Sequence, residues 1–207
     1  MGQTYKTIDA GAVGEIVEKK SRFISYVEPV TTEVEALTFI EKIKKKHYDA
    51  RHNCFAFSVG IDMPLLRFSD DGEPQGTAGK PILEVITGAE ITNVIIVVTR
   101  YFGGTLLGTG GLVRAYTDSA RDGLGRCRIV TKQQMMETAL ICDYTDLGKL
   151  QYLFASENIP IKDIQYAEQV ELTVQIPVDR LDNADKLVTE ATAARVKLVR
   201  KGDLFWA

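Results

Sequence analysis

Residues 94–114 have the sequence VIIVVTRYFGGTLLGTGGLVR, in which an apolar strand, a glycine-rich loop and the start of a helix follow one another. The first six residues are β-branched, which favours a buried strand. Five glycines follow between residues 103 and 111, and glycine permits positive φ angles and close backbone approach. Two arginines and two aromatic residues flank or border the loop, so the segment predicts a binding surface more than a catalytic centre.

The spacing of these glycines argues against the common nucleotide-binding loops. Gly103 and Gly108 are spaced like the glycine pair of a P-loop, but Thr109-Gly110 stands where Lys and Ser/Thr must contact phosphate and Mg²⁺. Gly108-Thr109-Gly110 opens a dinucleotide fingerprint, but Val113 takes the place of the third glycine. The amides at the start of the following helix remain available to a phosphate of another kind. The alternative is a tight turn that only packs the strand against the helix.

The composition is that of a globular protein with room for a hydrophobic core. The chain has 207 residues, of which 45% are hydrophobic and 26% charged, and its net charge is −3. Residues 1–130 carry 16 basic and 16 acidic side chains, and residues 131–207 carry 9 and 12. Any RNA-binding face is therefore expected to be a local patch in the N-terminal part.

The three cysteines lack the spacing of a zinc site or a redox pair. No secretory segment follows Met1, and no apolar run approaches the length that spans a membrane. We therefore expect a reduced, cytoplasmic setting with no membrane contact, no cofactor and no metal.

The first 130 residues predict a mixed domain. Strands are expected over 12–18, 22–30, 53–59 and 93–99, and helices from Thr32, over 77–88 and over 110–124, with a polar loop at 69–76. Thr32 can cap the first of these helices, and Lys44, Lys45 and Lys46 complement the dipole at its end.

The remaining residues, 131–207, show a clearer pattern. Strands are expected over 137–144, 159–166, 170–178 and 195–205, with helices over 146–157 and 180–193. This βαββαβ order is that of the split ferredoxin-like fold. The expected fold class is therefore α+β with two domains, 1–130 and 131–207.

Two motifs in the N-terminal part identify a family resemblance. Residues 69–81 have the sequence SDDGEPQGTAGKP, and residues 100–108 have the sequence RYFGGTLLG. Both resemble motifs of the YigZ/Impact family. The resemblance implies an N-terminal domain similar to the second domain of a small-subunit ribosomal protein and to domain IV of elongation factor G. It implies a C-terminal domain similar to domain V of that factor.

The resemblance also bears on function. Eukaryotic Impact proteins are linked to translational control through competition for a protein partner, and ribosome or nucleic-acid binding by bacterial members is an analogy from fold. The family supplies no catalytic residue.

An RNA or ribosomal partner would be bound by cations and aromatic rings around the glycine loop. Guanidinium groups hold phosphate bidentately, and exposed rings can stack on unpaired bases, although packing at a strand end is the alternative for the aromatics. The glycines would shape the loop, and Arg22 with its neighbouring lysines would extend the basic surface. The candidate residues are Arg22, Arg51, Arg100, Tyr101, Phe102, Gly103, Gly104, Gly108 and Arg114.

Asp70, Asp71 and Glu73 give an enzymatic alternative, because three carboxylates within four residues can hold Mg²⁺ or Mn²⁺, with His52 as a base or fourth ligand. The same stretch is also a good turn whose acids precede a helix. A third possibility is a buried ion-pair network of these acids with Arg100 and Arg51 that supports the glycine loop.

The sequence thus favours a translation-linked binding protein that contacts RNA or the ribosome. A protein-partner regulator of translation or stress responses is one alternative, and a metal-dependent hydrolase is the other. We expect an interaction protein more than an enzyme.

Overall fold

The computed structural model describes residues 4–207, which divide into two compact units. One unit is Tyr5–Thr131, and the other contains Lys132–Ala207 together with Thr4. Each unit has its own hydrophobic core, and the helices and sheets confirm the expected α+β fold class. No helix within residues 4–207 is both long and apolar enough to cross a membrane.

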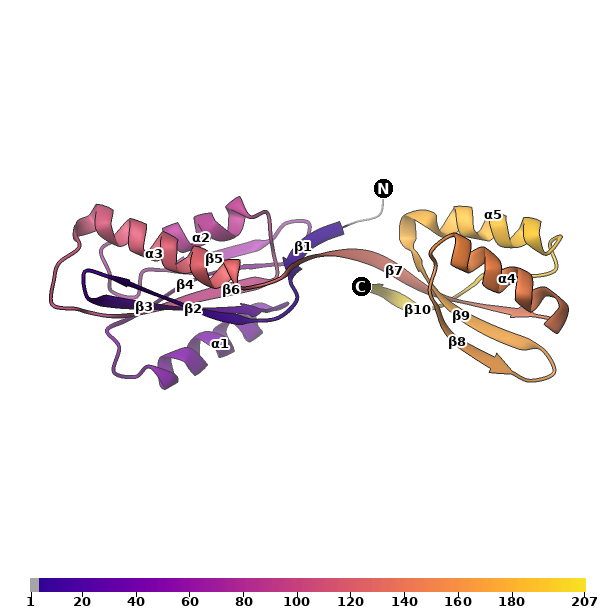
Figure 1. Cartoon of the computed structure of the whole chain (residues 1–207), viewed down its shortest axis with the longest axis horizontal. Helices are drawn as coiled ribbons and strands as arrows, with labels where there is room; N and C mark the ends of the chain where they lie inside the picture. Colours follow the sequence, from indigo (N-terminus) through magenta and orange to yellow (C-terminus); the bar gives the residue numbers. More distant parts are fainter. Residues whose placement is uncertain (1–3) are drawn as a thin grey trace. The chain divides into compact units, whose positions relative to one another are not determined.

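The N-terminal unit is built on a five-stranded sheet with three helices. Its elements are β1 (Thr4–Ile8), β2 (Ala12–Glu18), β3 (Ser21–Pro29), α1 (Glu33–Lys46), β4 (His52–Val59), β5 (Leu65–Ser69), α2 (Gly79–Gly88), β6 (Val94–Tyr101) and α3 (Gly108–Gly125). The strand order is β2-β3-β6-β4-β5, and every neighbouring pair is antiparallel. In Figure 1, α1 lies on one face of this sheet, and α2 and α3 lie on the other.

Alternate residues of the central strands supply two separate cores. Phe23, Ile96 and Val98 belong to the core beneath α2 and α3, whereas Ile24 and Val97 belong to the core beneath α1. Successive side chains of a strand point to opposite faces. Because helices cover both faces, every residue of β6 before Tyr101 is buried.

The starts of α1 and α2 follow ordinary helix chemistry. The Thr32 side chain accepts a hydrogen bond from the Glu35 amide, as the sequence predicts for the start of α1. Pro81 lies in the first turn of α2, where its missing N–H removes no helical hydrogen bond.

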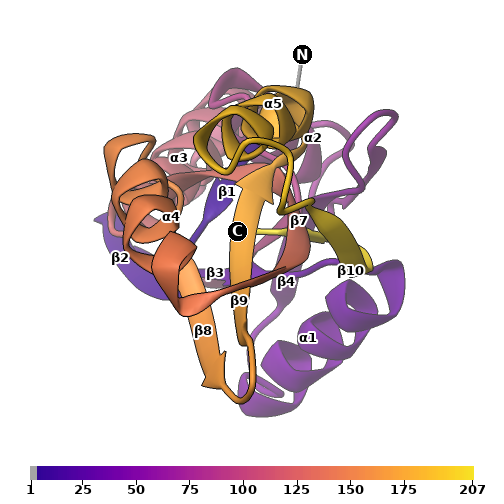
Figure 2. The ribbon, with the colours of Figure 1, turned by 90° about the vertical axis from the view of Figure 1, so that its right-hand side faces the viewer.

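The C-terminal unit has the expected βαββαβ order. Its elements are β7 (Ile129–Cys142), α4 (Tyr144–Ser156), β8 (Ile161–Tyr166), β9 (Val170–Pro177), a short 3₁₀ turn (Val178–Arg180), α5 (Leu181–Ala191) and β10 (Val199–Trp206). β7 pairs with β10 and β9, and β9 pairs with β8. Figure 2 shows α4 and α5 together on one face of these strands. Val170, Leu172, Val174 and Ile176 are buried beneath the helices, as their alternation predicts.

Several boundaries differ from the sequence expectations. β1 and β5 were not predicted; β5 lacks a clean alternation because it is an edge strand whose residues Leu65–Phe68 are all exposed. β7 begins at Ile129 instead of residue 137, and α3 begins at Gly108 instead of residue 110. The predicted loop 69–76 begins one residue too early, since Ser69 still pairs with Phe55.

Candidate nucleic-acid interface

The glycine loop is fixed against the turn between β2 and β3. The Gly103 amide donates to Ser21 Oγ at 3.1 Å. A Cβ atom at Gly103 would lie 2.0 Å from the Lys20 carbonyl carbon, so only glycine allows this approach. Gly108, which starts α3, has a φ of +71°, a value that side chains rarely tolerate. These two glycines place residues 102–107 at the end of the sheet, beside the start of α3.

A buried ion pair lies beneath this loop. Arg100 Nη1 is 2.6 Å from Glu73 Oε1, and the side chains are only 7% and 4% exposed. The Tyr116 hydroxyl, from α3, donates to the same Glu73 oxygen at 2.8 Å. The Arg100 Nε is buried and has no hydrogen-bond partner within residues 4–207. Arg100 was predicted to contact phosphate directly, but the structure commits one end of its guanidinium to Glu73.

The same guanidinium lies between two aromatic rings. The Arg100 Cζ is 5.5 Å from the centre of the Phe23 ring and 5.7 Å from that of Phe102. Phe23 is fully buried, whereas Phe102 is 44% exposed. Contacts of this kind are attractive because the cation faces the electron-rich ring. Phe102 is therefore an exposed ring that contacts a guanidinium bound to Glu73.

Tyr101 lies on the opposite face of the sheet from Arg100 and does not share a platform with Phe102. Its hydroxyl donates to Asp49 Oδ1 at 2.9 Å and lies 2.9 Å from His47 Nδ1. The other ring nitrogen of His47 is 2.6 Å from the Tyr26 hydroxyl. Burial lowers the pKa of His47, and the neighbouring Lys46 lowers it further. The prediction that Tyr101 and Phe102 stack on bases together thus meets a geometric obstacle.

The predicted arginines outside the ion pair are exposed, but their surroundings differ. Arg22 forms two hydrogen bonds with the Glu15 carboxylate, at 2.6 and 2.9 Å, on the same face as Tyr101. Arg51 and Arg114 are exposed and form no ion pair with any residue in 4–207. Arg51 lines a hollow with Phe102, Arg114 lines a second hollow with Lys19, and Leu107 borders both. Arg51, Phe102 and Arg114 are therefore brought to one end of the unit.

The acidic residues do not converge on a metal site. The Asp70 carboxylate accepts from the amides of Gly76, Ala78 and Gly79 at 2.8–3.0 Å, so it caps the start of α2. Asp71 accepts from the Asn53 amide at 2.7 Å and lies 3.6 Å from Lys44. Glu73 pairs with Arg100, so each of the three acids already accepts hydrogen bonds from a different part of the protein. Within residues 4–207, no group of three or more His, Cys, Asp or Glu side chains is placed to hold a metal ion.

His52 and Cys54 are also held by separate partners. His52 Nδ1 is 2.8 Å from the Asp71 carbonyl oxygen, and Cys54 Sγ is 2.9 Å from that of Asp70. Cys54 also lies 3.3 Å from the Tyr116 hydroxyl. Burial raises the pKa of the Cys54 thiol and, more strongly, that of the Tyr116 phenol. Both groups are neutral at physiological pH, so this cluster offers no activated nucleophile.

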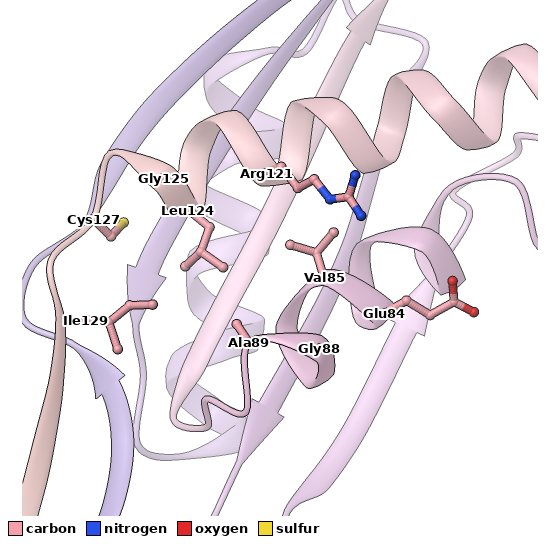
Figure 3. Close-up of a pocket in the computed structure, with 9 residues that line it drawn as sticks. All are labelled: Glu84, Val85, Gly88, Ala89, Arg121, Leu124, Gly125, Cys127 and Ile129. Carbon is pink, nitrogen blue, oxygen red and sulfur yellow. The ribbon is translucent and has the colours of Figure 1, made fainter.

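A different hollow lies between α2 and α3, away from these residues. It has a volume of about 620 Å³ and is lined mainly by small and aliphatic residues. Figure 3 shows Val85, Leu124 and Ile129 in it, with Glu84 on α2 and Arg121 on α3. Glu84 and Arg121 are the charged residues that line it, and none of the candidate binding residues predicted from the sequence does.

Sequence reasoning missed several residues that build the interface. The roles of Phe23 and Tyr116, which contact Arg100 and Glu73, depend on strand pairing and on helix placement. Strand alternation could have predicted one feature of the site, because it places the adjacent residues Arg100 and Tyr101 on opposite faces of the sheet. Of the proposed ion-pair network between the acids and Arg100 and Arg51, the Glu73–Arg100 pair is present, whereas Arg51 pairs with none of these acids.

Comparisons with known proteins identify the family. The model of the Impact N-terminal domain matches residues 19–124, and that of a domain of unknown function, DUF1949, matches residues 140–195. The IMPACT family member YvyE of Bacillus subtilis is 39% identical over 99% of this chain and 94% of its own length. The IMPACT family member YigZ of Escherichia coli is 39% identical over 79% of this chain and 81% of its own.

A solved structure described as that of a hypothetical protein is also similar. It has 33% identity and a TM-score of 0.64, over 98% of this chain and 99% of that one. These matches span both units, in agreement with the resemblance seen in the motifs. The chain belongs to the Impact family.

Proposed function

We propose that this protein is a translation-linked binding protein that contacts RNA, on its own or in the ribosome, through the glycine-loop end of its N-terminal unit. The contact surface consists of the exposed residues Lys19, Arg51, Phe102, Leu106, Gly108, Thr109 and Arg114, and we call it the loop surface. Membership of the Impact family supports the link to translation. A cytoplasmic location is part of this proposal, because the ribosome is there.

The position of the Phe102 ring is the main support for the proposal. Its ring is exposed, yet it rests on a guanidinium that is itself fixed by Glu73. A ring held in this way loses little side-chain entropy when a base stacks on it. Arg51 and Arg114, both without ion pairs in residues 4–207, can then contact the phosphates on either side.

The start of α3 adds to the attraction for phosphate. Its first turn has no acidic residue, and its N-cap residue, Leu107, forms no capping hydrogen bond. Free amides and the positive end of the helix dipole favour an anion at this position. The loop surface therefore combines an aromatic platform with phosphate-binding groups, as single-stranded RNA requires.

The test is fluorescence anisotropy with a labelled single-stranded 12-mer RNA, from 50 to 300 mM KCl. Phe102→Ala is expected to weaken binding by about 1–3 kcal/mol, the usual contribution of one stacked base. Arg51→Ala and Arg114→Ala are each expected to weaken binding and to reduce the salt slope by about one.

Matched controls lie on the same unit, away from the loop surface. Arg121→Ala removes the same charge from α3, two turns after Arg114, and Phe68→Ala removes an equally exposed ring from β5. Both controls are expected to bind like the wild type. Equal losses in the controls and in the loop-surface variants would refute the proposed surface.

One observation favours a protein partner as a second candidate. β5 is an edge strand, and its side chains Leu65, Leu66 and Phe68 are 39–48% exposed. Exposed edge strands accept extended peptides by adding a strand to the sheet. A regulator that binds a protein through this edge would lose binding in Phe68→Ala and not in Phe102→Ala, so the same two variants separate the candidates. The metal-dependent hydrolase gains no support, because its acids already bind protein donors.

A further inference from the structure

The loop surface contains a half-open cavity whose size suits a small molecule. It has a volume of about 460 Å³, and its lining includes Arg51, His52, Arg100, Phe102, Leu107 and the first two residues of α3. Ligand sites are usually apolar cavities of about 300–1,000 Å³ with a few convergent polar groups. This cavity has that composition, because its lining is mainly apolar with a few polar side chains.

The cavity has two cationic features beyond the ordinary surface. Arg100 is 6% exposed, and its buried Nε has no acceptor in residues 4–207 although its Nη1 bonds to Glu73. A buried donor without a partner is costly, which points to an acceptor that the protein does not itself supply. Arg51 adds an unpaired positive charge, since Glu73 offsets only the charge of Arg100. The uncapped start of α3, with Gly108 and Thr109 at the cavity, adds free amides. Together these groups favour an anion such as a phosphate.

The remaining lining suits the other parts of a nucleotide. Phe102, supported by Arg100, presents an aromatic wall, and Leu106 and Leu107 add apolar surface. His52 Nδ1 faces the Asp71 carbonyl oxygen, which only accepts, so this nitrogen must donate. His52 Nε2 lies at the cavity, 4.0 Å from Glu73 Oε1. A sugar hydroxyl both donates and accepts hydrogen bonds, so it can bond to this nitrogen.

We propose that this cavity binds one nucleoside monophosphate group, with the phosphate among Arg51, Arg100 and the start of α3, the base against Phe102 and a ribose hydroxyl at His52. The proposal rests on the proposed function, because it gives the loop surface a specific pocket for a phosphorylated nucleotide. The group has two sources, a free mononucleotide or the 5′-phosphorylated end of an RNA.

Isothermal titration calorimetry of the full chain with AMP, UMP, adenosine and inorganic phosphate tests the pocket. We expect one site per chain, and at least tenfold weaker binding of adenosine than of AMP. Phe102→Ala is expected to weaken AMP at least fivefold and to leave inorganic phosphate unchanged, whereas Arg51→Ala weakens both. His52→Ala is expected to weaken AMP and to leave 2′,3′-dideoxy-AMP unchanged. Arg121→Ala and Phe68→Ala serve as controls that bind AMP like the wild type.

RNA binding distinguishes the sources and separates the two proposals. A 5′-phosphorylated 12-mer that binds at least fivefold more tightly than its 5′-hydroxyl form identifies the RNA end as the source. Equal affinities together with AMP binding identify the free nucleotide. If the RNAs bind equally and AMP does not bind at millimolar concentration, the pocket is refuted while the proposed function stands. If AMP binds and neither RNA does, the pocket stands and RNA binding is refuted.

Discussion

The ion pair between Arg100 and Glu73 allows a quantitative test of how the interface is built. In Arg100→Met, the Tyr116 hydroxyl is the one hydrogen-bond donor within residues 4–207 that the Glu73 carboxylate keeps, with His52 Nε2 4.0 Å away, and the Glu73 side chain is 4% exposed. Removing one partner of a buried ion pair usually costs about 3–5 kcal/mol, because the other charge stays buried. For a unit the size of Tyr5–Thr131, this corresponds to a fall in melting temperature of roughly 10–20 °C.

The double variant Arg100→Met/Glu73→Gln separates the ion pair from the loss of packing. Replacing both charges with neutral side chains of similar size is often close to neutral, so we expect it to recover at least half of the lost stability. Urea unfolding followed by pulsed hydrogen exchange and mass spectrometry measures the stability of the N-terminal unit directly, because peptides from β6 and β9 report the two units separately. A loss below about 1 kcal/mol in Arg100→Met, or losses that simply add in the double variant, would refute the reasoning.

Three further predictions follow from other contacts. Burial lowers the pKa of His47, so the unfolded state binds more protons than the folded state below about pH 6.5. The free energy of unfolding should therefore fall as the pH drops from 7.5 to 5.5, and it should fall less steeply in His47→Gln. Parallel pH profiles of the two proteins would contradict this. Gly103→Ala should lower the free energy of unfolding in urea by about 1–3 kcal/mol, because the added Cβ meets the Lys20 backbone. Gly110→Ala, whose Cβ would have no atom within 4 Å, should not lower it. Equal effects of the two substitutions would count against the close approach at Gly103. Mg²⁺ or Mn²⁺ at 5 mM should leave the melting temperature unchanged, because Asp70 already accepts three amides; a rise abolished by Asp71→Asn would restore the hydrolase alternative.

Periodicity predicted most of the fold because most elements bury one face or both. The alternation from Val170 to Ile176 and the apolar run that begins at Val94 both became buried strands. β5 escaped prediction for the opposite reason, since an exposed edge strand has no buried face to impose a pattern. The capped start of α1 at Thr32 was predictable because capping is a local interaction.

The candidate site was predicted less completely, because its contacts are long-range. The motifs located the glycine loop and the acidic turn, but they could not assign partners to each charge. Asp70 caps α2 and Glu73 binds Arg100, so neighbouring acids have unrelated roles. Arg100 and Tyr101 are adjacent in the chain and lie on opposite faces of the sheet, so they could not act together as a single surface.

Cosedimentation with ribosomes tests the central claim most directly. Purified protein is sedimented with ribosomes from 50 to 150 mM KCl as wild type, as Arg51→Ala/Arg114→Ala and as the Arg121→Ala control. We predict saturable binding of the wild type and the control, with binding by the double variant reduced at least tenfold. Binding that the double variant retains, or no wild-type binding at 50 mM KCl, would contradict the claim that the loop surface contacts the ribosome.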